Sequence, residues 1–464
     1  MNRFLRILFM ACLFLSAGAF QIGRAEARMV SVGLSIGKAS IQVSSSSSIT
    51  ATDAGGKRHS IGTSAVFRSS GKGSASLGSR TFHLPVTLSS GHPLSFNGRR
   101  YRGTFRILGG NSGITLVNVL DLEDYLRGVL KMEVNPAWAM EAVKAQAVVS
   151  RTYALRSIQQ NNGKNGYDLG DSVLSQVYRG MNAEDKRADE AIRATKGIVV
   201  KYGGSVAFTP FHSDSGGATA DVSTVWGGSI AYLRGVKEPF PPSSPNSTWE
   251  TRLSRAQVEK ALRQSGADVG SLRELRIGDA DPFGRANTLT AVGTKGTKQV
   301  KSHSFRMAAG STVIKSTSFS LASPSAGTSP VPLPVPVPRT ERQKLPAKEI
   351  PTSNTPMSAS EEGQLTALTE QGVFNSEELM DMLMNPEKRK GYLIRALRTT
   401  RPVQPSPEPL PSFPSAGDSF VFRGKGWGHG VGLSQWGAKI MAEKGWDYRK
   451  IIQHYYPGTV VGSM

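Results

Sequence analysis

The alternation of apolar and polar residues predicts a chain that starts with strands and then forms a long helix. Residues 31–36, 101–108 and 114–119 have the character of strands, and clusters of glycine and serine break the runs. Residues 136–159 are apolar on nearly every side, which indicates a buried helix with Asn135 as its N-cap. The predicted fold class is therefore α+β, with mixed or antiparallel strands around this long buried helix.

Shorter elements are expected after the buried helix. They are a helix at 182–196, a hairpin at 197–207, a helix at 254–265, strands and turns at 272–319 and a helix at 433–444. Gly203 and Gly204 mark the tip of the hairpin, because glycine readily adopts the positive φ angles that tight hairpin turns require.

The composition changes near residue 323. Proline and valine dominate residues 323–338 and proline returns at 401–414, a composition typical of extended linkers. Two short helices are expected in between, the better one at 375–384. Five segments follow: a signal peptide at 1–27, an N-terminal β-rich region at 28–100, the first part of the main domain at 101–322, a Pro-rich and largely disordered insertion at 323–417, and a Gly-rich C-terminal part at 418–464. In the alternative interpretation, residues 323–417 are a true interdomain linker.

The N-terminus has the features of a secretory signal. Arg3 and Arg6 precede the apolar residues 7–20, and the small residues of 25–27 offer a cleavage site. An uncleaved anchor is the alternative, and no second apolar run of membrane-spanning length follows. Cys12 is the only cysteine, so the mature chain would contain no disulfide. We expect an exported protein of the periplasm or cell wall.

The formal net charge of +21 changes the expected partners. Removing residues 1–27 takes away three arginines and one glutamate, which leaves +19. A basic protein is attracted to anionic polymers and lipid surfaces. In an exported protein this favours anionic envelope material over nucleic acid, although the charge alone names no partner.

Two cations lie inside the apolar stripe of the predicted helix. Lys144 and Arg151 point the same way, and Gln146 and Tyr153 point roughly opposite. Burying an unpaired cation is costly, so each should meet a carboxylate, a carbonyl oxygen or an anionic ligand. A structural salt bridge remains equally open for each. Its candidate partners are Glu123, Asp124 and Asp214.

Glu133 comes directly before the predicted helix start. A carboxylate there, followed by cationic and amide side chains on the helix, indicates an acid/base site. Two influences on its pKa oppose each other: the helix N-terminus and the cations Lys144 and Arg151 would lower it, whereas burial would raise it. The alternative is a helix-entry carboxylate that only satisfies backbone donors.

Several longer motifs follow one another along the chain: residues 122–155, a Gln-Val-Tyr run within 175–180, a His-Ser-Asp-Ser-Gly-Gly run within 211–219, a Trp-Gly-Gly run within 225–228 and the glycine-rich block at 424–438. In kind and order they resemble the motifs of the SpoIID/LytB family of bacterial cell-wall proteins. Long motifs in a fixed order are a much stronger signal than one short pattern. The resemblance implies that residues 101–322 and 418–464 form one SpoIID-like catalytic domain, from which the insertion loops out.

The resemblance to the stage II sporulation protein D branch implies a peptidoglycan lytic transglycosylase, with Glu133 as catalytic acid and base. Glycoside hydrolysis usually needs two carboxylates. A lytic transglycosylase instead uses the C6 hydroxyl of N-acetylmuramic acid as nucleophile, so one carboxylate serves twice and the products carry 1,6-anhydro ends. The matching helix positions are implied to line the site. They are Lys144, Gln146, Arg151 and Tyr153.

A polar loop and the glycine-rich block supply the other candidate substrate-binding residues. His212 and Ser213 follow a predicted strand, where they could line the cleft or simply form a turn. In the glycine-rich block, Trp427 and Trp436 could stack on sugars and His429 could hydrogen-bond a glycan. The alternative is a tight structural loop in which His429 is a core residue.

The LytB branch implies a different function. Its members are described as enhancers of a wall amidase, so the chain could be a non-enzymatic module that binds glycan strands or an amidase. A scaffold that docks through residues 323–417 is a third alternative. Some SpoIID proteins bind zinc just before the Gln-Val-Tyr run, but Leu174 and Ser175 stand there and the mature chain has no cysteine. We therefore expect no metal and no cofactor.

Overall fold

The computed structural model describes residues 28–71, 73–110, 112–161, 163, 166–171, 176–241, 243–322, 357–370, 382, 388–399 and 419–464. Helices and several sheets occur together, which confirms the expected α+β class. The predicted signal peptide, most of the predicted insertion and nearly all of the helix expected at 375–384 lie outside the described residues. None of the described helices combines the length and apolar character needed to cross a membrane.

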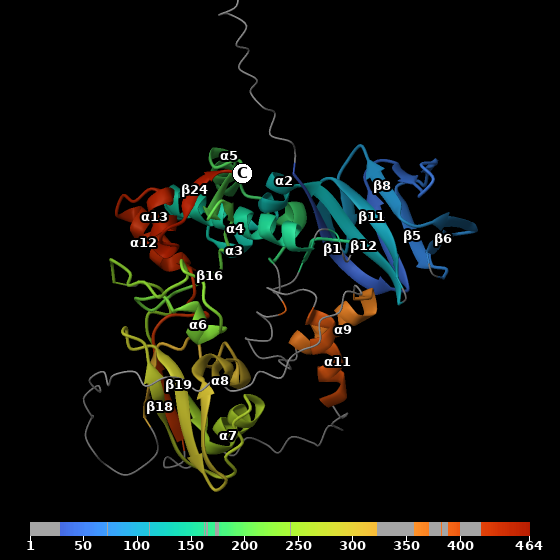
Figure 1. The fold of residues 1–464 in the computed structure, drawn as a ribbon. Coiled ribbons are helices and arrows are strands. Elements are labelled where there is room, and N and C mark those ends of the chain that lie inside the picture. The colour runs from blue at the N-terminus through green and yellow to red at the C-terminus, as the bar shows by residue number, and fades with distance from the viewer. Residues whose placement is uncertain are drawn as a thin grey trace, which may run out of the picture.

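Two largely antiparallel sheets form the N-terminal region, at the right of Figure 1. The seven-stranded sheet has the order β13 (Leu169–Gly170), β1 (Met29–Lys38), β12 (Gly113–Asp121), β11 (Thr104–Gly110), β8 (Val86–Ser90), β3 (Ile49–Thr52), β4 (Arg58–Ser60). The six-stranded sheet has the order β10 (Arg99–Tyr101), β9 (Leu94–Phe96), β2 (Ser40–Ser45), β5 (Ser64–Ser69), β6 (Ser74–Leu77), β7 (Arg80–His83). Alternate apolar residues of these strands share one core.

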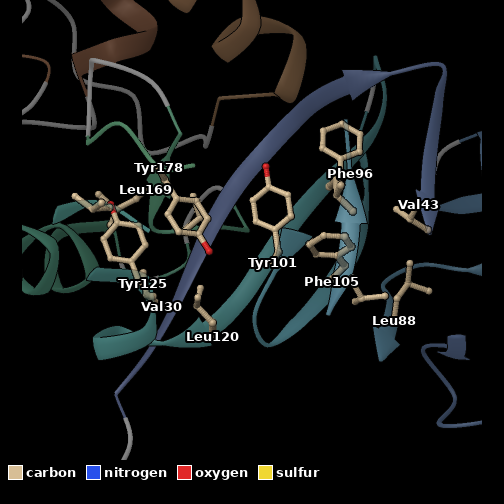
Figure 2. Close-up of a cluster of buried hydrophobic side chains, with 14 of the residues drawn as sticks. Val30, Val43, Leu88, Phe96, Tyr101, Phe105, Leu120, Tyr125, Leu169 and Tyr178 are labelled. Atoms are coloured by element: carbon tan, nitrogen blue, oxygen red, sulfur yellow. The ribbon is translucent and has the colours of Figure 1, made fainter. Parts of the chain in front are cut away.

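A cluster of buried tyrosines joins this region to the helices that follow. The rings of Tyr101 and Tyr125 lie on either side of Tyr178, at centroid distances of 5.8 Å and 5.1 Å (Figure 2). The Tyr178 hydroxyl donates a hydrogen bond of 2.7 Å to Asn118 on β12. Because Tyr125 belongs to α2 (Leu122–Arg127), the cluster fixes that helix against the strands.

Helix α4 (Met140–Asn161) runs through the centre of the molecule and is buried along most of its length (Figure 1). It begins later than the predicted Pro136. The Asn135 side chain caps a separate turn, in which the Trp138 amide donates to the Asn135 carbonyl at 3.1 Å. The prediction of a helix start at Asn135 was therefore wrong, and Glu133 does not stand at the N-terminus of α4.

Arg151 is completely buried on α4, with 0% of its side chain exposed. Its Nη2 and Nε donate to the two carboxylate oxygens of Glu123 at 2.7 and 2.9 Å. The guanidinium also donates to the Thr195 hydroxyl and to the carbonyls of Ile192 and Ile198. Every nitrogen of the group is used within the core. The interpretation of Arg151 as a substrate-binding residue is therefore corrected in favour of the structural salt bridge.

The C-terminal segment packs against α4 on the side away from the N-terminal sheets (Figure 1). It consists of α12 (Gln435–Glu443), α13 (Tyr448–Tyr455) and β24 (Val460–Ser463). Strand β24 extends the hairpin of β14 (Ile198–Tyr202) and β15 (Ser205–Val206). This confirms the predicted hairpin, and Gly203 and Gly204 at its tip have φ angles of 55° and 79°.

Gly437 shows how tightly this segment is packed. A Cβ atom at this position of α12 would collide with the hydroxyl of Tyr455 and with a carboxylate oxygen of Glu238. These two groups are themselves joined by a hydrogen bond of 2.8 Å. A glycine is required here because α12 must approach both α13 and the loop that carries Glu238.

A third group of elements lies below the central helix in Figure 1. It contains β17 (Trp249–Ser254), α7 (Arg255–Gln264), β18 (Leu272–Ala280), β19 (Ala286–Gly293), β20 (Gly296–Lys301), α8 (Ser302–Ala309), β21 (Phe319–Ala322) and β22 (Ser419–Gly424). Helix α7 lies where the sequence predicts it, with a capping box between Ser254 and Gln257. Phe319 pairs with Gly424, so the chain before and after residues 323–418 meets in one sheet.

Two further helices, α9 (Ala359–Glu370) and α11 (Arg389–Thr399), share a small apolar core of their own. Helix α9 lies against β1, where the Tyr167 hydroxyl donates a hydrogen bond to Glu362. Helix α9 therefore rests on the N-terminal sheet, and α11 packs against α9.

Replacing Arg151 by methionine should destabilise the fold strongly, because it leaves the partly buried Glu123 carboxylate without its main partner. We expect a loss of about 3–5 kcal/mol in the free energy of unfolding. Lys144→Met is the matched control: Lys144 is 23% exposed and pairs with Glu141 on the same helix, so its loss should cost no more than about 1 kcal/mol. Urea titrations of both variants test this, and equal midpoints would contradict it.

Candidate active site

Glu133 is the last residue of the single-turn helix α3 (Leu130–Glu133). Leu130 and Val134 are buried in the N-terminal core, whereas Met132 is 47% exposed. The Glu133 side chain is partly buried. The turn is therefore anchored by its apolar residues, and it presents its carboxyl group where the core meets the surface.

Burial controls the acidity of this carboxyl group. It raises the pKa of Glu133 to about 7, and a hydrogen bond from the Val177 amide offsets part of the rise. Lys144 and Arg151 do not lower this pKa, since each is paired with a glutamate of its own. Of the two opposing influences on the Glu133 pKa that the sequence predicts, burial therefore prevails over the nearby cations. A carboxyl group with this pKa is about half protonated at neutral pH and can both give and take a proton.

Two tyrosines lie within electrostatic reach of Glu133. Burial raises the pKa of Tyr153 to about 12; Arg389 opposes this rise and the Glu133 charge adds to it. Burial also places the pKa of Tyr125 well above its usual range, with a smaller contribution from Glu133. The Tyr125 hydroxyl donates to the Gln176 side chain at 3.2 Å. Both tyrosines therefore stay neutral within electrostatic reach of Glu133.

Gln435, the first residue of α12, joins the C-terminal segment to Glu133. Its Nε2 donates to the backbone carbonyl of Glu133 at 2.8 Å and lies 3.4 Å from Gln146 Oε1. Gln146 is 1% exposed, and its own Nε2 donates to Ser150. The structure thus places Gln146 behind Gln435 as a buried support, which corrects its interpretation as a residue that faces substrate.

A tryptophan pair adjoins the same contact. Trp138 and Trp436 have ring centroids 4.9 Å apart with an interplanar angle of 59°. Arg187 holds the Trp138 loop by donating to the Trp138 carbonyl at 3.0 Å, and Lys439 lies 5.5 Å from the centre of the Trp436 ring. Partly exposed aromatic surface of this kind is suited to contact with the apolar face of a sugar.

The histidines His212 and His429 lie together but serve the fold. The Val431 amide donates to His429 Nδ1 at 3.1 Å, so His429 Nε2 must carry the proton that is donated to the Phe211 carbonyl. His212 donates from Nδ1 to the Val431 carbonyl at 3.2 Å. His212 is buried, and Trp226 packs on the His429 ring at 4.6 Å. These contacts support the alternative of core histidines and correct their interpretation as glycan ligands.

Ser213 and Trp427 lie between the histidines and the tryptophan pair. The Trp436 amide donates to the Ser213 carbonyl at 3.0 Å. The next residue, Asp214, exchanges two backbone hydrogen bonds with Trp427. Trp427 is 37% exposed. Backbone contacts thus connect these two candidates to the Gln435 contact with Glu133.

The structure therefore divides the predicted site residues into four sets. Glu133 and Tyr153 lie together, and Ser213 and Trp427 lie on a connected surface. Lys144 pairs with Glu141 and is not part of the Glu133 environment. The remaining candidates are core residues: Gln146, Arg151, His212 and His429.

The sequence reasoning missed some contributors to this site. Tyr125, Trp138 and Gln435 were not singled out, although all three lie in or beside the recognised motifs. The one local signal for Gln435 was its place directly after the helix cap Ser434, whose hydroxyl accepts from the Gly437 amide. Its bond to Glu133 joins residues far apart in the chain and leaves no local pattern.

No group of three or more histidine, cysteine, aspartate or glutamate side chains is placed to hold a metal ion, as far as the described part of the chain extends. Leu174 and Ser175, where zinc ligands would be sought, lie outside that part.

Comparison with known proteins shows which sequences this chain is similar to. The family model for the stage II sporulation protein (SpoIID) matches residues 110–202, which include Glu133, Tyr153 and Val177. The chain is 28% identical to the amidase enhancer of Bacillus subtilis over 382 residues, and 22% identical to stage II sporulation protein D of Bacillus amyloliquefaciens over 361 residues.

The chain is similar to proteins of the SpoIID/LytB family. The match to the amidase enhancer covers 82% of this chain but 46% of that protein, so the chain spans about half the length of this relative. The match to the sporulation protein covers 75% of this chain and 76% of that protein. A further relative is an uncharacterised protein of Brachyspira hyodysenteriae, 24% identical over 79% of this chain and 73% of its own length.

The buried histidines predict a loss of stability in acid. Burial holds the pKa of His429 at about 3 and that of His212 and His303 well below the usual range, and neighbouring arginines lower all three further. The unfolded chain binds these protons near pH 6.5 and the folded chain does not, so stability is full above about pH 6.5 and falls below it.

His303→Gln isolates one of these contributions. From pH 7.5 to pH 5 the parent should lose about 2 kcal/mol relative to this variant, because one proton-binding group has been removed. Urea unfolding at the two pH values measures the difference. His92→Gln, at an exposed position, should track the parent. If His303→Gln and the parent lost stability in parallel, the assignment of a neutral buried His303 would be refuted.

Proposed function

We propose that this chain is an exported peptidoglycan lytic transglycosylase with Glu133 as its catalytic acid and base. The observation that carries the proposal is the burial that raises the pKa of Glu133 to about 7. Burial and the Val177 amide are the influences on this pKa among the described residues, and no second carboxylate is one of them. That arrangement suits a reaction in which the substrate supplies its own nucleophile.

The reaction runs through one carboxyl group in two steps. Protonated Glu133 gives its proton to the glycosidic oxygen while the bond from C1 of N-acetylmuramic acid to that oxygen breaks. The C6 hydroxyl of the same sugar then bonds to C1 and passes its proton to the Glu133 carboxylate. The product has a 1,6-anhydro end, water is not consumed, and the acid is restored. One group can perform both steps because its pKa lies near the working pH.

The surroundings of Glu133 fit these steps. The Val177 amide donates to the carboxyl group, burial limits its contact with water, and the neutral Tyr125 and Tyr153 lie within its electrostatic reach. Gln435 fixes the backbone of the same residue. The tryptophan pair beside it offers a surface for a sugar of the strand. The high positive charge favours the anionic cell wall as the place of action.

A second function is favoured by the name of one relative. The Bacillus subtilis protein is an amidase enhancer, and this chain matches it over most of its own length. In this alternative the chain binds glycan strands or a cell-wall amidase and cuts nothing itself. The two functions differ in whether Glu133 is needed for a chemical product.

Purified glycan strands, both peptide-bearing and denuded, should be digested with the full chain and the products analysed by mass spectrometry. We expect anhydro-ended fragments from the parent. Glu133→Gln should reduce their rate by about 10²–10⁴-fold, because the proton donor is lost. Glu190→Gln, at an exposed position on α5 (Lys186–Ala194), is the matched control and should retain parental activity.

Two results would overturn the enzymatic proposal. One is the absence of anhydro products from the parent on both kinds of strand, and the other is full activity of Glu133→Gln. The enhancer alternative is then tested by adding the chain to a cell-wall amidase and measuring peptide release. An increase that Glu133→Gln reproduces would favour the alternative.

A further inference from the structure

Trp427 stands out among the tryptophans because it is exposed. All six tryptophans lie within the described residues. Trp427 is exposed over 37% of its surface, whereas the other five are buried or half-buried. Leaving a large aromatic side chain in water forfeits the free energy that burial would gain. Its position on the surface therefore suggests contact with something outside the chain.

The backbone on both sides of Trp427 is held rigidly. Its amide and carbonyl exchange hydrogen bonds of 2.8 and 2.9 Å with Asp214, and the Gly428 amide donates to the Lys315 carbonyl at 2.9 Å. Gly426 has a φ of 75°, and a Cβ atom there would run into the backbone of Asp214 and Ser215. An exposed ring on a fixed backbone loses little freedom on binding, which makes it a suitable platform for a ligand.

Polar groups from the third group of elements stand beside this ring. Lys315 Nζ lies 5.7 Å from the centre of the Trp427 ring and donates to Asn246 Oδ1 at 3.0 Å. The two residues come from the loops before β21 and before β17. An aromatic face with an ammonium and an amide at its edge can contact the apolar face of a sugar and also its hydroxyl, acetamido or carboxylate groups.

The position of Trp427 relative to Glu133 follows from three contacts. Trp427 pairs with Asp214, the preceding Ser213 accepts from the Trp436 amide, and Gln435 donates to Glu133. Paired residues have Cα atoms about 5 Å apart and neighbours in the chain 3.8 Å apart, so Trp427 lies within about 15 Å of Trp436. A glycan chain of a few sugars is therefore long enough to contact both Trp427 and the Trp138–Trp436 pair.

We propose that Trp427, Lys315 and Asn246 form a remote subsite for an amino sugar of the glycan strand. The strand runs from Glu133 and the Trp138–Trp436 pair across Ser213 to this subsite. The third group of elements, which supplies Lys315 and Asn246, thereby extends the binding surface of the central fold. The inference rests on the glycan-binding part of the proposed function but not on its chemistry.

Binding of oligosaccharides of different length tests the remote subsite. The parent for this experiment is the full chain carrying Glu133→Gln, so that binding is measured without cleavage, and the probes are N-acetylglucosamine oligomers in a calorimeter. The hexasaccharide should bind more tightly than the disaccharide. Trp427→Ala should weaken hexasaccharide binding about tenfold and leave disaccharide binding unchanged, because only the longer probe reaches the ring.

Matched variants separate the subsite from general effects. Lys315→Met should weaken hexasaccharide binding severalfold, whereas Lys298→Met, an exposed lysine on β20, should have no effect. Trp427→Phe keeps an aromatic face and should recover part of the loss. Far-ultraviolet circular dichroism of both Trp427 variants shows whether each has folded. Should Trp427→Ala fail to fold, the comparison is made with Trp427→Phe.

The proposal is overturned if Trp427→Ala and Lys315→Met bind the hexasaccharide as tightly as the parent, or if the parent binds both probes equally well. Equal loss for the disaccharide and the hexasaccharide would also overturn it, since the effect would then be general. Because no cleavage is involved, a failure here leaves the anhydro-product experiment standing. If the anhydro-product experiment gives a negative result, this subsite still stands as part of a non-enzymatic module that binds glycan strands.

Discussion

The hydrogen bond from Gln435 to the carbonyl of Glu133 joins residues that are 302 positions apart. Around it the C-terminal segment closes against the central helix, with Gln146 behind it and the Trp138–Trp436 pair beside it. Residues recruited from both ends of the domain thus meet at one turn of helix. The C-terminal segment 419–464 is too short to bury a core by itself, so this contact depends on the rest of the domain.

This closure also explains the acidity of Glu133. A carboxyl group on a short surface helix would ordinarily be charged at neutral pH. Here burial removes water from it, and the backbone amide of Val177 donates to it. The cations that could have lowered its pKa are taken up by salt bridges, most firmly by the buried pair of Arg151 and Glu123. Because Lys144 and Arg151 are paired with other glutamates, they do not lower the pKa of Glu133.

Local patterns predicted the local structure well. The hairpin tip at Gly203 and Gly204 and the capped helix α7 follow from turn and cap chemistry within a few residues. Asn135 was predicted to start the long helix, but a capping side chain can close an isolated turn as well as start a helix, and here it closes a turn. The salt bridge of Arg151 was foreseen only as one alternative, since burial alone does not choose a partner. The contact between Gln435 and Glu133 could not be predicted, because no local sequence pattern indicates that two residues 302 positions apart lie close together.

The central claim, that burial gives Glu133 a pKa close to 7, can be tested without any substrate. The full chain labelled with ¹³C at the glutamate carboxyl carbon should be titrated by nuclear magnetic resonance, with Glu133→Gln used to assign the signal. The Glu133 signal should titrate with a midpoint near pH 7, well above the ordinary value of 4.5 for a glutamate carboxyl group. A Glu133 midpoint at that ordinary value would contradict the account, because the group would then be a solvated carboxylate with no proton to give at neutral pH.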